Sequence, residues 1–91
     1  MLFHLYIEIN LPPDMPEEKA NDLRARETAQ VQQYQREGKW PQMWRVAGRY
    51  ANISIVDCAD ADELHRLVSA LPLFPYITTT VTPLARHPAR L

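Results

Sequence analysis

Cysteine and glycine are both scarce in this sequence, with one cysteine, Cys58, and two glycines among 91 residues. A single cysteine cannot form an intrachain disulfide. No second cysteine or cysteine–histidine cluster accompanies it, so a structural zinc site is not expected either. We expect the Cys58 thiol to be partly buried and inert, because no activating partner stands near it in the sequence.

Long apolar runs are also missing. No segment approaches the run of roughly 18 apolar residues that a membrane-spanning helix needs. The start of the chain, MLFHLYIEINLPP, has no basic segment of the kind that opens a signal peptide. We therefore expect no membrane partner and, by default, a cytoplasmic location.

Neither sign of charge is in excess, since 10 lysines and arginines oppose 11 aspartates and glutamates. Such a balance offers no electrostatic attraction to nucleic acid or to a membrane surface. The hydrophobic fraction of 46% is typical of a folded protein rather than a disordered one. A chain of this length makes one small domain, residues 1–91, and its limited core favours added stability from oligomerisation.

Alternation of apolar and polar residues predicts a first strand at residues 3–9. Prolines at positions 12 and 13 end this strand because they cannot donate ladder hydrogen bonds. A long helix is then expected from about Pro16 to Glu37, with Gly38 as its C-terminal cap.

The remaining elements are two strands, a second helix and a last strand. The two strands, at about residues 44–48 and 52–56, would form a hairpin that turns at residues 48–51. The helix has Asp60 as a candidate N-cap, since Glu63 follows at capping-box spacing, and Pro72 ends it. The β-branched stretch YITTTVT predicts the last strand.

The order β-α-β-β-α-β predicts an α+β fold, the ferredoxin-like plait. In this plait a four-stranded antiparallel sheet carries both helices on one face. The second face of the sheet, with His4, Tyr6 and Glu8, would be of mixed polarity. We expect another subunit to cover it.

Glu27 is the leading candidate for chemistry. At about 100° per residue, it falls at the centre of the one apolar face of the long helix. The other members of this face are Ala20, Leu23, Val31 and Tyr34. If the face packs on the sheet, the carboxylate is partly desolvated, which raises its pKa and suits it to acid–base work near neutral pH. The alternative is a solvated acid that pairs with Arg24 or Arg26.

Arg45 and Arg49 flank the bend RVAGR, and an arginine pair suits a small carboxylate ligand. The alternative is an exposed strand arginine or an ion pair between subunits, and the sequence by itself favours this alternative. Four aromatic residues stand nearby in the sequence: Tyr34, Trp40, Trp44 and Tyr50. Such residues belong more often to a core or an interface than to a ligand pocket.

The three histidines, His4, His65 and His87, stand at unrelated spacings. Metal ligation needs clustered ligands, so no metal site is predicted.

Three long blocks and a short final one carry a family resemblance: MLFHLYIEINLPPDM, QREGKWPQMWRVAGRYAN, LHRLVSALPLFPY and RHP. Together they resemble muconolactone delta-isomerases of the β-ketoadipate pathway, over nearly the whole chain. The resemblance implies a cytoplasmic isomerase with a ferredoxin-like fold, no cofactor and a decameric ring. The implied reaction converts (S)-muconolactone, a small lactone, into 3-oxoadipate enol-lactone during bacterial catabolism of catechol-derived aromatics.

The resemblance also places a family glutamate at Glu27. One desolvated carboxylate could remove the γ-proton of the lactone and return it at the α-carbon. Donors near the lactone carbonyl would stabilise the dienolate oxygen, and an arginine would hold the acetate side chain. The residues expected to bind substrate are Tyr34, Trp40, Arg49 and Asn52.

One position departs from the family. Muconolactone isomerases carry histidine where this chain has Arg49, whereas the related chloromuconolactone dehalogenases resemble it in having a basic residue there. A 5-chloromuconolactone dehalogenase is therefore an alternative function. A non-catalytic binding or assembly module on the same fold is a third reading, and it requires a fully solvated Glu27.

Overall fold

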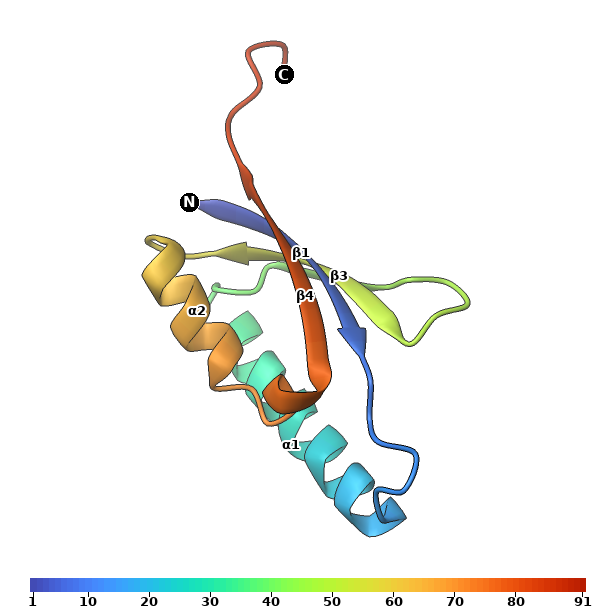
Figure 1. Ribbon diagram of the computed structural model, residues 1–91. Coiled ribbons are helices and arrows are strands. Elements are labelled where there is room, and N and C mark those ends of the chain that lie inside the picture. Colours follow the sequence, from blue (N-terminus) through green and yellow to red (C-terminus); the bar gives the residue numbers. More distant parts are fainter.

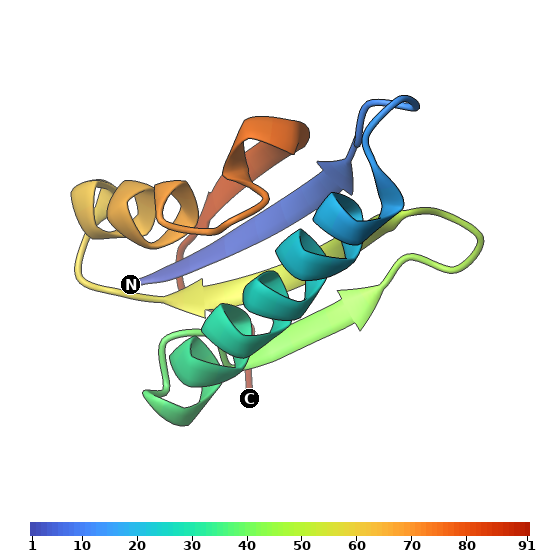
Figure 2. The same ribbon diagram turned by 90° about the horizontal axis from the view of Figure 1, so that it is seen from below.

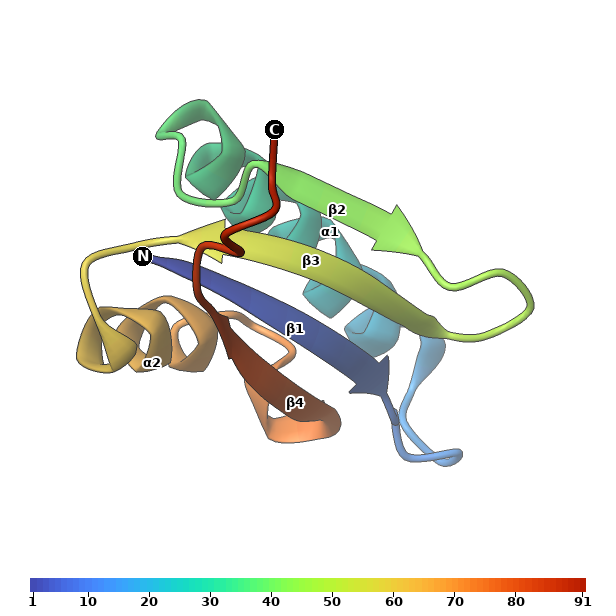
Figure 3. The same cartoon turned by 90° about the horizontal axis from the view of Figure 1, so that it is seen from above.

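Strand β1 (Leu2–Ile9) lies inside the sheet of the computed structural model, which describes all residues 1–91. It pairs antiparallel with β3 (Ala51–Asp57) on one side and with β4 (Ile77–Leu84) on the other. The short strand β2 (Gln42–Arg45) pairs antiparallel with β3, which gives the order β2-β3-β1-β4. Figure 3 shows the four strands in this order.

Helices α1 (Glu17–Arg36) and α2 (Ala61–Ser69) cover one face of this sheet, and a short 3-10 helix, Phe74–Tyr76, leads into β4. Figures 1 and 2 show both helices on the same side, with α1 along the β2–β3 side. The expected ferredoxin-like fold is confirmed. Neither helix has the length and apolarity that crossing a bilayer requires.

The ends of both helices follow from local sequence. Gly38 adopts φ +76, a left-handed conformation that suits glycine. Its N–H donates to the Gln35 carbonyl and the next N–H, of Lys39, donates to Tyr34, which is a Schellman cap. At α2 the side chain of Asp60 accepts from the Glu63 N–H at 2.8 Å, so the predicted N-cap is confirmed.

The hairpin differs from expectation at its turn. Strand β2 ends at Arg45, and the chain turns over residues 46–49, where the Arg49 N–H donates to the Val46 carbonyl. Gly48 has φ +79, as the third residue of a type II turn requires. The glycine therefore makes the turn itself rather than a bend inside a strand.

The core fills the space between the helices and the sheet. Its buried side chains include Phe3 and Leu5 from β1, Val31 and Tyr34 from α1, and Leu67 from α2. The opposite face of the sheet carries no helix (Figure 3). Large apolar or aromatic side chains are exposed on this face, among them Leu2, Trp44 and Leu84. The last residues leave β4 without further helix or strand.

Candidate active site

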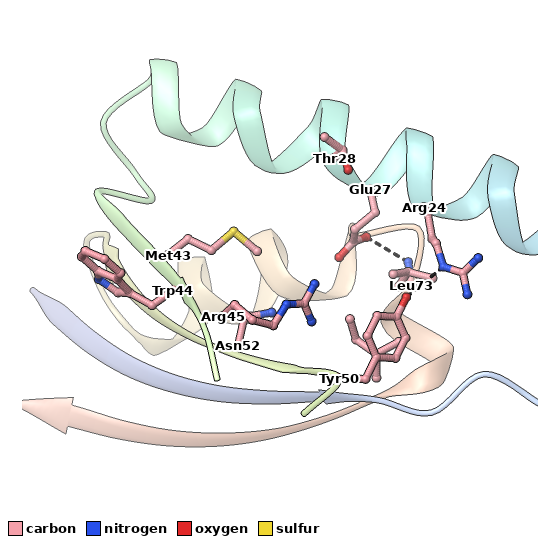
Figure 4. Close-up of a pocket in the computed structure, with 10 residues that line it drawn as sticks. Arg24, Glu27, Thr28, Met43, Trp44, Arg45, Tyr50, Asn52 and Leu73 are labelled. Atoms are coloured by element: carbon pink, nitrogen blue, oxygen red, sulfur yellow. Dashed lines mark hydrogen bonds between the residues drawn. The ribbon is translucent and has the colours of Figure 1, made fainter. Parts of the chain in front are cut away.

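A cavity of about 270 Å³ opens between α1 and the β2–β3 edge of the sheet. Figure 4 shows that side chains reach it from several elements. Helix α1 contributes Arg24, Glu27 and Thr28, and β2 contributes Met43 and Arg45. The other side chains are Tyr50 from the residue before β3, Asn52 from β3, and Leu73 from the loop after α2. The cavity is the place where the long helix, the hairpin and the C-terminal half of the chain meet.

Glu27 is half-buried in this cavity. Its Oε1 atom accepts a hydrogen bond of 3.0 Å from the backbone N–H of Leu73. Burial raises the pKa of its carboxyl above the ordinary value of 4.5, and the Leu73 N–H works against that rise only in part. The carboxylate is therefore held in one orientation and made more basic at the same time.

The arginines near Glu27 on α1 do not neutralise it. Arg26 forms an ion pair with Asp22 at 3.0 Å, whereas Arg24 hydrogen-bonds to Asn21 and Tyr50. No ion pair of the structure includes Glu27. The solvated, paired glutamate that was the alternative reading is not what the structure contains.

Two cations and a tyrosine form the outer wall of the cavity. The Nε atom of Arg24 donates to the Tyr50 hydroxyl at 2.8 Å. The guanidinium carbons of Arg24 and Arg45 lie 5.8 and 5.4 Å from the centroid of the Tyr50 ring, within cation–π distance. Neither arginine has a carboxylate partner. Both positive charges remain free for an anionic ligand.

Of the four residues expected to bind substrate, Asn52 alone lines the cavity. Tyr34 and Trp40 are 6% and 1% exposed and stack on each other in the core, with ring centroids 5.8 Å apart. The Tyr34 hydroxyl donates to the Leu67 carbonyl, which joins the two helices. Tyr34 shares a helix face with Glu27, but it lies two turns further on, where the helix packs closely.

Arg49 lies in the hairpin turn and is exposed. Its Nη1 atom donates to the Tyr6 hydroxyl at 3.3 Å and lies 3.9 Å from Glu8 Oε1. These partners belong to the helix-free side of β1, so Arg49 does not line the Glu27 cavity. The two arginines that flank the turn thus serve different surfaces, and the expected pair is replaced by Arg45 with Arg24.

From the sequence, Arg24 was expected only as a possible ion-pair partner of Glu27. Its position three residues before Glu27 places it on the same side of the helix, a signal that was available. Met43 and Arg45 alternate along β2, which also places them on one face. The hydrogen bond from the Leu73 backbone N–H to Glu27 could not be predicted in this way, because every residue except proline has such an N–H.

No group of three or more histidine, cysteine, aspartate or glutamate side chains is arranged to hold a metal ion. The fold and the cavity define a class of small ferredoxin-like α+β proteins in which a half-buried carboxylate on the first helix lines a cavity against the sheet. Within this class, the family model described as muconolactone delta-isomerase matches residues 1–90. The chain belongs to the muconolactone delta-isomerase family.

Curated relatives agree along the whole chain. A muconolactone delta-isomerase of Cupriavidus pinatubonensis is 55% identical over 91 residues, covering 100% of this chain and 99% of the relative. A muconolactone delta-isomerase of Acinetobacter lwoffii is 50% identical, covering 100% and 95%. The expected isomerase family is therefore confirmed.

Solved structures give the same result. A crystal structure of muconolactone isomerase superposes with a TM-score of 0.95 at 45% identity, covering 100% of this chain and 95% of that one. A 5-chloro-2-hydroxyhydroquinone dehydrochlorinase from Burkholderia phenoliruptrix superposes with a TM-score of 0.66 at 18% identity, covering 96% of both chains. At that identity the second likeness concerns the fold alone.

Proposed function

We propose that this protein isomerises (S)-muconolactone to 3-oxoadipate enol-lactone, with Glu27 as the acid–base group. The observation that carries the proposal is the unpaired, half-buried Glu27 carboxylate in a cavity that also holds two free arginines. Membership of the muconolactone delta-isomerase family supplies the substrate class.

The reaction is a proton shift within an unsaturated lactone. The Glu27 carboxylate takes the γ-proton, and the electron pair that is left spreads over the dienolate to the carbonyl oxygen. The protonated Glu27 then returns a proton to the α-carbon, which moves the double bond. One carboxyl can serve both carbons because they belong to the same small ring. Its raised pKa brings the basicity of Glu27 closer to neutral pH, where proton transfer in both directions is efficient.

The substrate also carries an acetate side chain with a fixed negative charge. Arg24 and Arg45 lie at the exposed side of the cavity, and Tyr50 lies against both guanidinium groups. We assign these two arginines to the acetate carboxylate, because a guanidinium offers paired donors in the geometry of a carboxylate. Their charge would also offset the repulsion between the substrate carboxylate and Glu27.

The test is Glu27→Gln, which keeps the size of the side chain and an oxygen that can accept from Leu73. We expect kcat for muconolactone to fall by about 10²–10⁴-fold, the usual contribution of a general acid–base group. Glu18→Gln, at an exposed glutamate in the first turn of α1, is the matched control and is expected to keep full activity. Turnover of Glu27→Gln at the wild-type rate would remove Glu27 from the mechanism.

The same assay separates the alternatives. Chloride release from 5-chloromuconolactone faster than isomerisation of muconolactone would identify a dehalogenase. Absence of turnover with either lactone would favour a non-catalytic module. The dehalogenase alternative rested on the basic residue Arg49. Because Arg49 lies outside the cavity, it does not distinguish the substrate there, and the isomerase remains the favoured function.

We also propose that the protein assembles into the homodecamer implied by the family resemblance, in the cytoplasm. The support is the helix-free face of the sheet, where Trp44 is 66% exposed and Leu2 and Leu84 are also exposed. Side chains of this kind are typical of a surface that a second copy covers. Light scattering coupled to gel filtration measures the mass of the assembly, and a monomer at micromolar concentration would contradict the proposal.

A further inference from the structure

Two polar side chains are buried in the chain, and both belong to β3. Asn52 is 8% exposed and Ser54 is not exposed at all. They are two residues apart, so they point to the same face of the strand, the one that α1 covers. Ser54 stands between Leu5 of β1 and Met43 of β2. A buried hydroxyl in such a place needs a partner.

The partner of Ser54 is Asn52, whose Oδ1 atom accepts from the Ser54 hydroxyl at 2.8 Å. This bond determines how the Asn52 amide is turned. The Ser54 hydroxyl has no other acceptor in the structure, so an amide turned the other way would leave its O–H buried without a partner. The oxygen of the amide therefore faces Ser54, and its nitrogen faces away.

The Nδ2 atom of Asn52 donates to no protein acceptor in the structure, and Asn52 lines the Glu27 cavity. Figure 4 shows Asn52 on the sheet side of this cavity and Glu27 pointing toward the sheet from α1. A neutral, oriented and unused N–H donor thus lies on the wall opposite the carboxylate. The arginines, in contrast, are exposed.

We propose that the Asn52 amide donates a hydrogen bond to the lactone carbonyl oxygen and stabilises the dienolate, and that Ser54 is the positioning residue that holds this amide. The inference rests on the proposed function and adds the group that receives the developing charge. As Glu27 takes the γ-proton, the electron pair moves to the carbonyl oxygen. The Asn52 proton stays on its nitrogen throughout.

The arrangement separates the two negative charges of the reacting molecule. The fixed charge of the acetate side chain stays at the exposed arginines, where water screens it. The developing charge on the carbonyl oxygen lies at the buried wall, where a fixed dipole interacts strongly and needs no reorganisation. Because Ser54 has already oriented the amide, the donor is in place before the substrate binds.

The first test is Asn52→Ala, with Asn52→Leu as a second variant that keeps the branched shape without polar atoms. We expect kcat to fall by about 10²-fold or more, as for other single oxyanion donors, with a much smaller change in KM. A raised KM with unchanged kcat would reduce Asn52 to a binding residue and overturn the proposal. Unchanged kinetics would overturn it as well.

The second test is a double-mutant cycle between Ser54→Ala and Asn52→Ala. Ser54→Ala alone is expected to lower kcat roughly tenfold, about the value of one lost hydrogen bond. In the Asn52→Ala background it should have no further effect on kcat, because Ser54 acts through that amide. Multiplying effects would show a general structural role and overturn the assignment of Ser54.

Ser69→Ala, at a serine that bonds only to its own helix, is the matched control and should keep wild-type kinetics. If Ser54→Ala does not fold, Ser54→Cys keeps a weak donor of similar size and should lie between wild type and the Asn52 variants. Glu27→Gln is measured beside them. An active Glu27→Gln refutes the proposed function, whereas an inactive Glu27→Gln with fully active Asn52 variants refutes this inference alone.

Discussion

The sheet-facing side of α1 has two halves that look alike in sequence and differ in structure. In the C-terminal half, Val31 and Tyr34 are buried against the core, and Tyr34 stacks on Trp40. One turn before Val31, Glu27 is only half-buried and lines the cavity. Tyr34 and Glu27 therefore point in the same direction from the axis of α1, but Tyr34 meets packed side chains and Glu27 meets a cavity.

This difference shows what helical periodicity measures. It identifies which side chains face the sheet, but not the distance to the sheet or what fills the gap. Along α1 the gap near Tyr34 is filled by Trp40, whose side chain is 1% exposed. Near Glu27 the facing side chains are those of Arg45 and Asn52, which leave a cavity. One half of the face is therefore structural and the other half is available for chemistry.

The largest expected effect comes from the structural half. Trp40→Ala should lower the free energy of unfolding by about 3–5 kcal/mol, because it removes a fully buried aromatic side chain. Urea denaturation followed by circular dichroism measures the loss, and kcat per folded molecule should not change. Trp40→Phe should cost clearly less, since the Trp40 indole N–H has no hydrogen-bond partner to lose. A specific loss of kcat in folded Trp40→Phe would place this residue in the site after all.

The next effect compares two arginines that flank one turn. Arg45→Ala should raise KM for muconolactone about 10- to 100-fold, since a hydrogen bond to a charged group is worth about 1.5–3 kcal/mol. Arg49→Ala is the matched control, and it should leave KM unchanged because Arg49 contacts Tyr6 and Glu8 instead of the cavity. Steady-state kinetics on both variants checks the difference, and equal effects would contradict the assignment.

These two arginines also show how far the sequence could predict the site. Alternation and helical periodicity were enough for the fold, because the order of elements and their apolar faces leave few arrangements. They were also enough for Glu27, which stands in the middle of an apolar face. Whether Arg45 and Arg49 face the cavity or the helix-free surface depends on where β2 ends. The turn that contains Gly48 begins at residue 46, earlier than the sequence predicted, because no strong turn dipeptide marks it.

Tyr34 and Trp40 show the same limit from another side. Tyr34 was expected near the substrate because it shares a helix face with Glu27, and Trp40 because it stands close to the hairpin in the sequence. The structure uses them to close the core between α1 and α2, through the stack and through the Tyr34 hydroxyl. Whether an aromatic residue packs or binds depends on three-dimensional distance, which its sequence position does not contain.

A smaller effect is expected from Tyr34→Phe. This change removes the hydrogen bond from the Tyr34 hydroxyl to the Leu67 carbonyl, 2.9 Å long and buried. We expect a loss of about 1 kcal/mol in the free energy of unfolding, with unchanged kcat and KM. Thermal and urea unfolding measure the loss. A raised KM without loss of stability would show that the hydroxyl serves the substrate rather than the core.

The smallest expected effect is on the pH dependence of stability, and it arises from Glu27 in the cavity-lining half of α1. Because burial raises the pKa of Glu27 above 4.5, the folded state holds this proton more tightly than the unfolded state does. The contribution of Glu27 to stability is therefore most favourable below its unfolded pKa, and it is lost as the pH rises through the raised folded value. Glu27→Gln lacks this loss, so its stability relative to wild type should increase over the same pH range.

Urea unfolding of both proteins across this range measures the difference, and a difference that is constant with pH would contradict a raised pKa. Activity should change in the opposite direction, since only the ionised Glu27 can accept the γ-proton. The kcat/KM of the wild type should fall as the pH is lowered into the range where its stability rises. The stability difference should stop changing at the folded-state pKa of Glu27, and the kcat/KM of the wild type should fall through that same pKa. Agreement between these two pH values would assign both trends to the Glu27 carboxyl.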